Sequence, residues 1–125
     1  MKQTLYLYNL RNEKGRHIEL LCLSQGIECR HVVSHEYGEY IGYIAQIPGF
    51  AAQGKPQAVP IFVDEMIIFK GFDQEMLGTF LAQYRQAGIE PVALKAGLTP
   101  TNIQWNSAQL HAELQQERAA FMQQQ

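Results

Sequence analysis

The sequence lacks the features that define several classes of protein. Its 125 residues include only two cysteines, and no apolar run approaches the roughly 18 residues of a membrane span. The formal net charge is −2, so no broad electrostatic attraction to nucleic acid or to an anionic membrane is expected. Residues 1–4 lead directly into a strand pattern and do not resemble a signal peptide. We therefore expect a cytoplasmic protein that does not associate with membranes.

Recognised catalytic and cofactor motifs are also missing. No serine lies in a nucleophile-elbow pattern, and the glycines do not form a phosphate-binding loop. Cys29, His31 and His35 are ligands of the kind that zinc prefers, but their spacing matches no known signature and a fourth ligand is missing. Cys22 and Cys29 do not form a C-x-x-C motif, and in a cytosolic chain we expect them to be reduced, partly buried thiols. The sequence predicts no cofactor, no metal and no assembled catalytic group.

Hydrophobic patterns and turn residues predict an alternation of strands and helices. Strands are predicted at residues 4–8, 27–33, 66–70 and 92–98, with a shorter extended piece at 59–63. Helices are predicted at residues 12–25, at 73–87 and from 106 onward, with a helical turn around 40–46. Asn12 and Asp73 are suitable helix N-caps, and Gly26 and Gly88 are suitable left-handed stops. Leu110, Leu114 and Phe121 are expected to form the apolar stripe of the last helix, and residues 34–58 are otherwise expected to be irregular.

Two stretches of the chain align without a gap at an offset of 62 residues, the separation of Gly26 from Gly88. Residues 5–10 fall on 67–72, and the sequence Gly-Ile-Glu at 26–28 recurs at 88–90. Both copies have the order strand, helix, Gly-Ile-Glu, strand. The repeat therefore predicts two β-α-β halves in series.

Two β-α-β units in series are typical of the ferredoxin-like β-α-β-β-α-β fold, an antiparallel four-stranded sheet with two helices on one face. We expect a single α+β domain over residues 1–125, with the last helix as an addition. A thioredoxin-like α/β fold is the alternative, because Pro60 precedes a short strand-like segment. Residues 5–9 and 26–28 also look like the N-terminal half of a glutathione transferase. That alternative requires a cis peptide bond at Pro60.

The most distinctive segment of the sequence is residues 95–105. A predicted strand ends there in a turn rich in hydroxyl and amide groups, and a capped helix follows. Turn amides and a helix N-terminus together make an anion site, to which Lys95 adds a positive charge. A purely structural interpretation is also open, because these residues are good turn formers. The candidate ligand-binding residues are Lys95, Thr99, Thr101, Asn102, Trp105 and Tyr8.

The sheet face opposite the two core helices is a second candidate surface. The repeat register places on it Tyr6, Tyr8, Ile68, Lys70 and Lys95. Aromatic and basic side chains on an open sheet are typical of some single-stranded nucleic-acid binders. Coverage of this face by the last helix or by a second subunit is favoured instead, because an exposed apolar surface is costly.

The C-terminal part of the sequence resembles a known family. The residues that carry the resemblance are Lys95-Ala96-x-Leu98-Thr99-Pro100-Thr101-Asn102-x-x-Trp105, followed by Leu110 and Glu113-Leu114. They are similar to the C-terminal signature of a bacterial family of uncharacterised proteins, one of the domain-of-unknown-function families. Weaker similarity extends back to the opening residues 7–9. The resemblance implies a bacterial protein but implies no activity, because the family has none established.

The sequence thus favours a small cytosolic module that binds a small anionic ligand or a protein partner, with a homodimer as its expected assembly. Two alternatives stay open. One is an enzyme with a site around Lys95 and the turn at residues 99–102. The other is a single-stranded nucleic-acid binder that uses the open sheet face, which the net charge disfavours.

Overall fold

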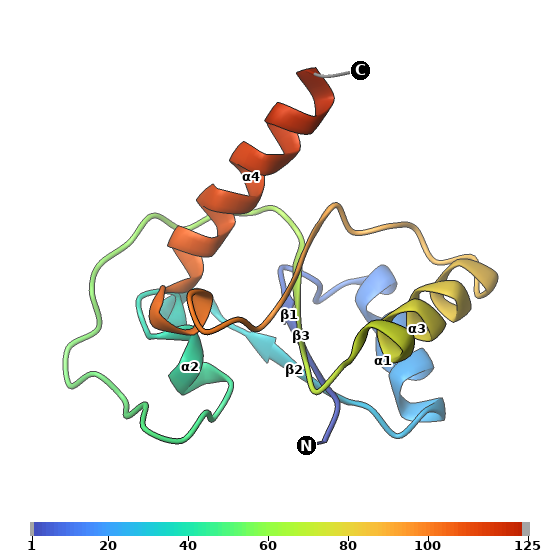
Figure 1. Cartoon of the computed structure of the whole chain (residues 1–125), viewed down its shortest axis with the longest axis horizontal. Helices are drawn as coiled ribbons and strands as arrows, with labels where there is room; N and C mark the ends of the chain where they lie inside the picture. Colours follow the sequence, from blue (N-terminus) through green and yellow to red (C-terminus); the bar gives the residue numbers. More distant parts are fainter. Residues whose placement is uncertain (1, 124–125) are drawn as a thin grey trace. The chain divides into compact units, whose positions relative to one another are not determined.

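The chain divides into two compact units in the computed structural model, which describes residues 2–123. The first unit comprises Met1–Val32 and Asp64–Gly97, and the second comprises Val33–Val63 and Leu98–Gln125. Each unit therefore combines segments that are distant in the sequence. Figure 1 shows the elements of both units, which we describe separately.

The first unit contains one mixed four-stranded sheet. Its strands are β1 (Thr4–Tyr8), β2 (Glu28–Val32), β3 (Met66–Lys70) and β4 (Leu94–Gly97), in the spatial order β2-β1-β3-β4. β1 is parallel to β2 and β3 is parallel to β4, whereas the central strands β1 and β3 are antiparallel. The crossovers are the helices α1 (Glu13–Ser24) and α3 (Gln74–Gln86). The unit thus consists of two β-α-β halves joined edge to edge.

The predicted β-α-β halves are confirmed, but the predicted wholly antiparallel sheet is wrong, because only its central pair is antiparallel. In the ferredoxin-like arrangement each half is split, so that a strand of the other half lies between its two strands. Here each crossover helix places its second strand directly beside its first, which makes those pairs parallel. The thioredoxin-like alternative is also disfavoured, because residues 59–63 form no strand and the described residues contain no cis peptide bond. Pro60 is therefore trans.

A pseudo-twofold relation between the halves follows the 62-residue offset. Tyr6 pairs with Ile68, its own counterpart in the repeat, at the centre of the β1–β3 ladder. The flanking pairs, Leu5–Phe69 and Leu7–Ile67, exchange under the same offset. A repeat that arose by chance would not be expected to place corresponding residues opposite one another in a ladder. The 62-residue repeat therefore has a structural basis.

Left-handed backbone conformations recur at the same offset. Asn9 has a φ of 59° and Gly71 a φ of 83°, at the point where each half leaves its first strand. Gly26 and Gly88 have φ values of 70° and 73° after α1 and α3, as predicted for the residues that end these helices. The same turns therefore connect strand to helix and helix to strand in both halves.

The core of the first unit lies between the sheet and its two helices, which Figure 1 shows on the same side of the strands. Counterparts in the two halves occupy equivalent core positions: Ile18 and Phe80 are both buried, as are Cys22 and Tyr84. Leu5, Leu7, Ile67 and Phe69 form the sheet side of this core. Burial of each large apolar side chain contributes roughly 1.5–3 kcal/mol.

Both predicted N-caps of the first unit are confirmed. The Asn12 side-chain oxygen accepts a hydrogen bond from the Gly15 backbone N–H at 2.9 Å. The Asp73 carboxylate accepts one from the Met76 N–H at 2.8 Å. Each bond satisfies an amide that the first helical turn leaves without an intrahelical acceptor, which is worth about 1 kcal/mol. Short polar side chains thus begin both helices where the sequence indicated.

The second unit is built from α2 (Ile41–Ile44), α4 (Ser107–Gln123) and two 3₁₀ turns, η1 (Ser34–Glu36) and η2 (Asn102–Gln104). Its two chain segments are joined by backbone hydrogen bonds. The Ile41 N–H donates to the Trp105 carbonyl at 2.8 Å, and the Ser107 N–H donates to the Tyr37 carbonyl at 3.1 Å. The helical turn predicted around residues 40–46 is thereby confirmed as α2.

Phe62 is the aromatic centre of the second unit. Its ring stacks on Tyr37 with a centroid distance of 4.4 Å and on His111 of α4 at 4.0 Å. The side chain is only 8% exposed, whereas its neighbours Ile61 and Val63 are exposed. The segment predicted to be a short extended piece is therefore held by one inserted ring and not by strand pairing.

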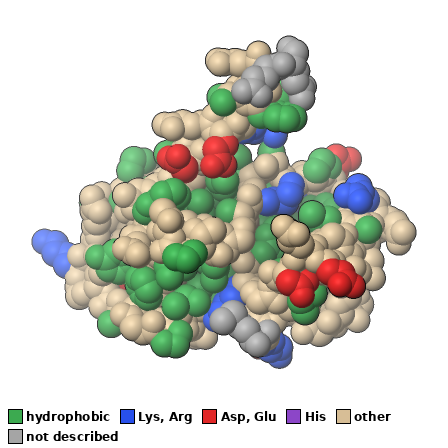
Figure 2. All heavy atoms as spheres, in the orientation of Figure 1, with side chains coloured by type: hydrophobic (Ala, Val, Ile, Leu, Met, Phe, Trp, Pro, Cys, Tyr) green, Lys and Arg blue, Asp and Glu red, His purple; other side chains and the backbone are tan. Residues whose placement is uncertain are grey.

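The apolar stripe predicted for the last helix is correct only at its start. Leu110 is buried, but Phe121 is 60% exposed. Tyr40 and Tyr43 are exposed as well, and Figure 2 shows hydrophobic side chains on the surface near α2. Within residues 2–123, no helix has both the length and the apolar character needed to cross a bilayer.

Candidate functional site

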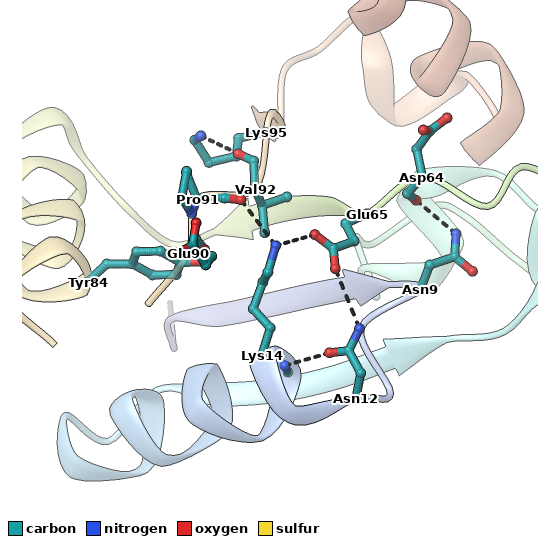
Figure 3. Close-up of polar contacts among 11 residues, drawn as sticks. Asn9, Asn12, Lys14, Asp64, Glu65, Tyr84, Glu90, Pro91, Val92 and Lys95 are labelled. Atoms are coloured by element: carbon teal, nitrogen blue, oxygen red, sulfur yellow. Dashed lines mark hydrogen bonds and ion pairs between the residues drawn. The ribbon is translucent and has the colours of Figure 1, made fainter. Parts of the chain in front are cut away.

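Three successive backbone carbonyls in the first unit are each bound by a side chain, as Figure 3 shows. The Tyr84 hydroxyl donates to the Glu90 carbonyl at 2.6 Å. The Lys14 ammonium donates to the Pro91 carbonyl at 3.2 Å, and the Lys95 ammonium donates to the Val92 carbonyl at 2.5 Å. These donors come from α3, α1 and β4, so the segment that leads into β4 is fixed from three directions.

An ion pair anchors the same region to α1. The Lys14 ammonium lies 2.6 Å from the Glu65 carboxylate, and both side chains are about three-quarters buried, at 23% and 29% exposure. The Asn12 side-chain amide donates to the other Glu65 oxygen at 3.5 Å. Charge-assisted bonds in a partly dehydrated setting are stronger than those on an open surface. Lys14 therefore links α1, the start of β3 and the segment before β4.

A small cavity lies beside this fixed segment. Its volume is about 170 Å³, and it is bounded by α3, by the strands β3 and β4, and by the residues before β4. Aromatic and aliphatic side chains form most of its wall: Ile67, Phe69, Phe80, Leu81, Tyr84, Pro91 and Val92. The two remaining lining residues are Arg85 and Lys95, which are both cationic. The cavity thus combines an apolar interior with positive charge.

The chemistry of this cavity suits an anion that carries a compact apolar body. Apolar walls with a few placed polar groups are the usual composition of a small-molecule site. A guanidinium can bind a carboxylate through two parallel hydrogen bonds, and an ammonium adds a point charge with three donors. Because Pro91 and Val92 are held by the bonds described above, this part of the wall is already ordered without a ligand.

Lys95 is the only predicted site residue that lines this cavity, and the other predicted residues lie elsewhere. Tyr8 is fully buried in β1. Thr99 and Asn102 bond each other reciprocally: the Thr99 N–H donates to the Asn102 side chain and the Asn102 N–H donates to the Thr99 hydroxyl, both at 2.9 Å. The turn thus uses these polar groups to stabilise itself.

The remaining predicted residues also have structural roles or no defined role. Thr101 is exposed and precedes η2, while the carbonyl of Trp105 accepts the bond from Ile41. The N-terminus of α4 is capped by Asn106, whose side chain accepts from the Gln109 N–H at 2.9 Å. Gln109 returns a bond to the Asn106 N–H at 2.8 Å, which makes a reciprocal cap. The amides expected to bind an anion here therefore have acceptors within the protein.

The potential metal ligands are dispersed. Within the part of the chain that the structure describes, no three His, Cys, Asp or Glu side chains are grouped so that they could hold a metal ion. His31 instead pairs with Glu19 of α1, and Cys29 packs against the core cluster that contains Cys22. Both cysteines are thiols, as predicted.

The Tyr84 phenol is expected to ionise at a pH about two units higher than tyrosine in water. Burial of the phenol, together with the negative charges of Glu65 and Glu90, raises the pKa of Tyr84 to about 12. A raised pKa means that the stability contributed by the neutral phenol is complete below about pH 10 and is lost between about pH 10 and 12. Titration of ζ-¹³C-tyrosine by NMR, with Tyr84 assigned through Tyr84→Phe, tests this. A midpoint near 10 for Tyr84 would contradict it.

Comparison with known proteins finds a family resemblance in the second half of the chain. Residues 65–121 match the family model DUF3783, which describes a domain of unknown function. The DUF3783 segment covers a little under half of the chain and includes β3, α3, β4, η2 and most of α4. All nine residues that line the cavity lie within it. No curated protein and no solved structure matches the chain.

Sequence reasoning missed Arg85, Tyr84 and Lys14 as parts of a site. Arg85 follows the apolar stripe of α3, and nothing in its spacing distinguishes it from a solvated helix residue. Its significance depends on the return of β4 beside β3, which carries Lys95 to the same cavity. The site could not be predicted without knowing that β3 and β4 pair in parallel.

Proposed function

We propose that this chain is a binding module for a small anionic ligand with a compact apolar body, held in the cavity between α3 and the β3–β4 pair. The observation that carries the proposal is the presence of Arg85 and Lys95 as the only charged residues on an otherwise apolar and aromatic wall. Two like charges beside one small cavity repel each other, and an anion between them removes that repulsion.

The cavity volume sets the size of the ligand. An apolar cavity of roughly 150 Å³ is enough to hold a benzene ring. The volume of about 170 Å³ found here therefore fits a single ring or a short branched chain, and its charged group would lie toward Arg85 and Lys95. A monocyclic aromatic carboxylate is the class of ligand that combines these properties, and benzoate is its simplest member.

Binding of benzoate to the full chain tests the proposal. We expect benzoate to shift the amide resonances of Tyr84, Val92 and Lys95 in a ¹H–¹⁵N spectrum, with saturation in the millimolar range that suits so small a ligand. Arg85→Gln and Lys95→Gln should each weaken binding about fivefold to tenfold, because each removes one charge-assisted contact. Arg16→Gln is the matched control, since Arg16 lies exposed on α1 and does not line the cavity.

A neutral analogue distinguishes charge recognition from simple filling of an apolar space. Benzyl alcohol has nearly the same size and no charge, so it should bind at least tenfold more weakly than benzoate. Equal shifts with both compounds would show that the two cations take no part. An absence of shifts with benzoate at 20-fold excess over about 1 mM protein would reject the cavity as an anion site.

Lys95 is better suited to binding than to covalent catalysis. Its ammonium donates to the Val92 carbonyl, and a hydrogen bond donated by the charged form favours that form. A nucleophilic lysine requires the neutral amine. The enzyme alternative around Lys95 is therefore the weaker proposal.

The location and assembly of the protein are separate proposals from the sequence. We propose a bacterial, cytoplasmic protein that forms a homodimer, on the basis of its composition and its resemblance to a family of bacterial proteins. Native mass spectrometry of gently purified protein measures the assembly directly and also detects any ligand that is retained. A monomer at micromolar concentration would remove the dimer from the proposal.

A further inference from the structure

Two pairs of reactive side chains face each other between α1 and β2. Cys22 and Glu19 lie three residues apart on one side of α1, and Cys29 and His31 lie two residues apart on one face of β2. Cys22 belongs to the buried core cluster and Cys29 packs against that cluster, while the Glu19 carboxylate is paired with the His31 ring. The two elements thus present matched pairs, thiol to thiol and carboxylate to imidazole.

The two thiols differ in their access to solvent. Cys22 is fully buried in the core, whereas Cys29 is partly exposed. Cys29 also lines an open groove of about 580 Å³ at the surface of the first unit, together with Glu19, Leu23 and His31. A molecule that enters this groove therefore meets Cys29, whereas Cys22 is buried in the core and is not part of the groove wall.

The two thiols differ in how readily they ionise. A hydrogen bond from Cys22 favours the thiolate of Cys29, so the pKa of Cys29 is lowered although burial and the charge of Glu19 oppose the change. As the donor, Cys22 keeps its proton, and the bond together with burial raises the pKa of its thiol. The thiolate is the reactive form of cysteine. The accessible sulfur is therefore the nucleophile, and the buried one is the proton donor.

We propose that Cys29 and Cys22 form a reversible redox pair, in which Cys29 reacts with a hydroperoxide in the groove and Cys22 then closes an intramolecular disulfide. The proposal concerns a groove lined by residues 2–31, so it stands independently of the cavity at Arg85 and Lys95.

The reaction has two balanced steps. The Cys29 thiolate attacks the peroxide, an S–O bond forms as the O–O bond breaks, and the departing oxygen takes a proton and leaves as water or an alcohol. The Cys22 sulfur then attacks the sulfenic sulfur, an S–S bond forms as the S–O bond breaks, and the hydroxide leaves with the Cys22 proton as water. Two thiols are oxidised by two electrons in total, and one peroxide is reduced.

Peptide mass spectrometry of the full chain after exposure to hydrogen peroxide tests the pairing. Cleavage after Arg16 and Arg30 yields one peptide that contains both cysteines, so an internal disulfide appears as the loss of two hydrogens without labelling by iodoacetamide. We expect this product in the folded protein, and we expect dithiothreitol to reverse it. Two alkylatable thiols after excess peroxide, or a disulfide between two chains, would overturn the proposal.

Two variants test the order of the steps. In Cys22→Ala the second step is blocked, so a sulfenic acid on Cys29 should accumulate and be trapped by dimedone. In Cys29→Ser no dimedone adduct should form on Cys22, because that thiol is buried and protonated. Circular dichroism identifies any variant that fails to fold.

The rate of oxidation provides a measurement that does not depend on a variant. The folded protein should lose its thiols at least tenfold faster than the same chain in urea, because unfolding breaks the hydrogen bond between them. Equal rates in the two states, or an adduct on Cys22 in place of Cys29, would overturn the assigned roles.

Discussion

Gly15→Ala is expected to destabilise the protein by at least about 3 kcal/mol, although glycine-to-alanine changes inside helices usually stabilise by about 0.5–1 kcal/mol. A Cβ at residue 15 would lie 1.6 Å from the carbonyl oxygen of Leu10. That carbonyl belongs to the backbone of a fully buried residue and cannot rotate away as a flexible side chain would. The substitution must therefore displace the connection between β1 and α1.

Gly78→Ala is the matched control and should have the opposite sign. Gly78 lies in α3, is exposed, and has no atom within 4 Å of the position that its Cβ would occupy. Its substitution should stabilise the protein by about 0.5–1 kcal/mol, chiefly by restricting the unfolded chain. Urea unfolding monitored by far-ultraviolet circular dichroism measures both variants. A Gly15→Ala midpoint at or above the wild-type value would contradict the predicted clash.

Phe62→Ala is expected to cost about 3–5 kcal/mol, the usual range for removal of a buried aromatic side chain. The ring loses stacking on both faces, with Tyr37 on one side and His111 on the other. Since Phe62 is the buried side chain of the segment before β3, we expect the residues around it to open before the sheet of the first unit unfolds.

Hydrogen exchange resolves that local effect. Amides of the second unit, including Ser107, should exchange faster in Phe62→Ala, while those of β1 and β3 keep more of their protection. Ile61→Ala is the control, because Ile61 is adjacent in sequence but 68% exposed, and it should change stability by less than about 0.5 kcal/mol. Equal effects of the two substitutions would show that ring stacking does not hold this segment.

Local sequence signals predicted the elements of the first unit closely. The strands at residues 4–8 and 66–70 are found with those bounds. Asn12 and Asp73 cap the helices as expected, because a cap depends only on a side chain and amides two or three residues ahead. Gly26 and Gly88 are left-handed for a similarly local reason. Features that depend on only a few neighbouring residues could thus be predicted from the sequence.

Features that depend on distant pairing were not predictable in the same way. Strand order decides which side chains share a cavity, and the repeat alone is compatible with split or unsplit β-α-β halves. The density of polar residues in the turn at residues 99–102 predicts an anion site, yet the Thr99 and Asn102 side chains each accept a hydrogen bond from the other residue's backbone N–H. Arg85 carried no local signal, and its proximity to Lys95 follows only from the parallel β3–β4 pair.

The pseudo-twofold relation also connects the two proposed sites. Cys29 pairs with Leu5 and Lys95 pairs with Ile67, and these two partners are counterparts in the repeat. Each half therefore has a hollow between its helix and its outer strand, one containing a thiol and the other a cation. Equivalent positions on the two outer strands therefore carry side chains of different reactivity, a thiol at Cys29 and an ammonium at Lys95.

The antiparallel pairing of two equivalent strands has a consequence for the protein during synthesis. β1 is synthesised 62 residues before β3. Until β3 has been synthesised, the edge of β1 that pairs with it has no partner. An unpaired strand edge is a template for other chains, and here the edge also matches the corresponding strand of a second copy. Exchange of β3 between neighbouring chains would reproduce every native pair of the sheet. A domain-swapped dimer is therefore a misassembled form that this topology permits, provided that residues 33–63 leave their packing in the second unit to act as its hinge.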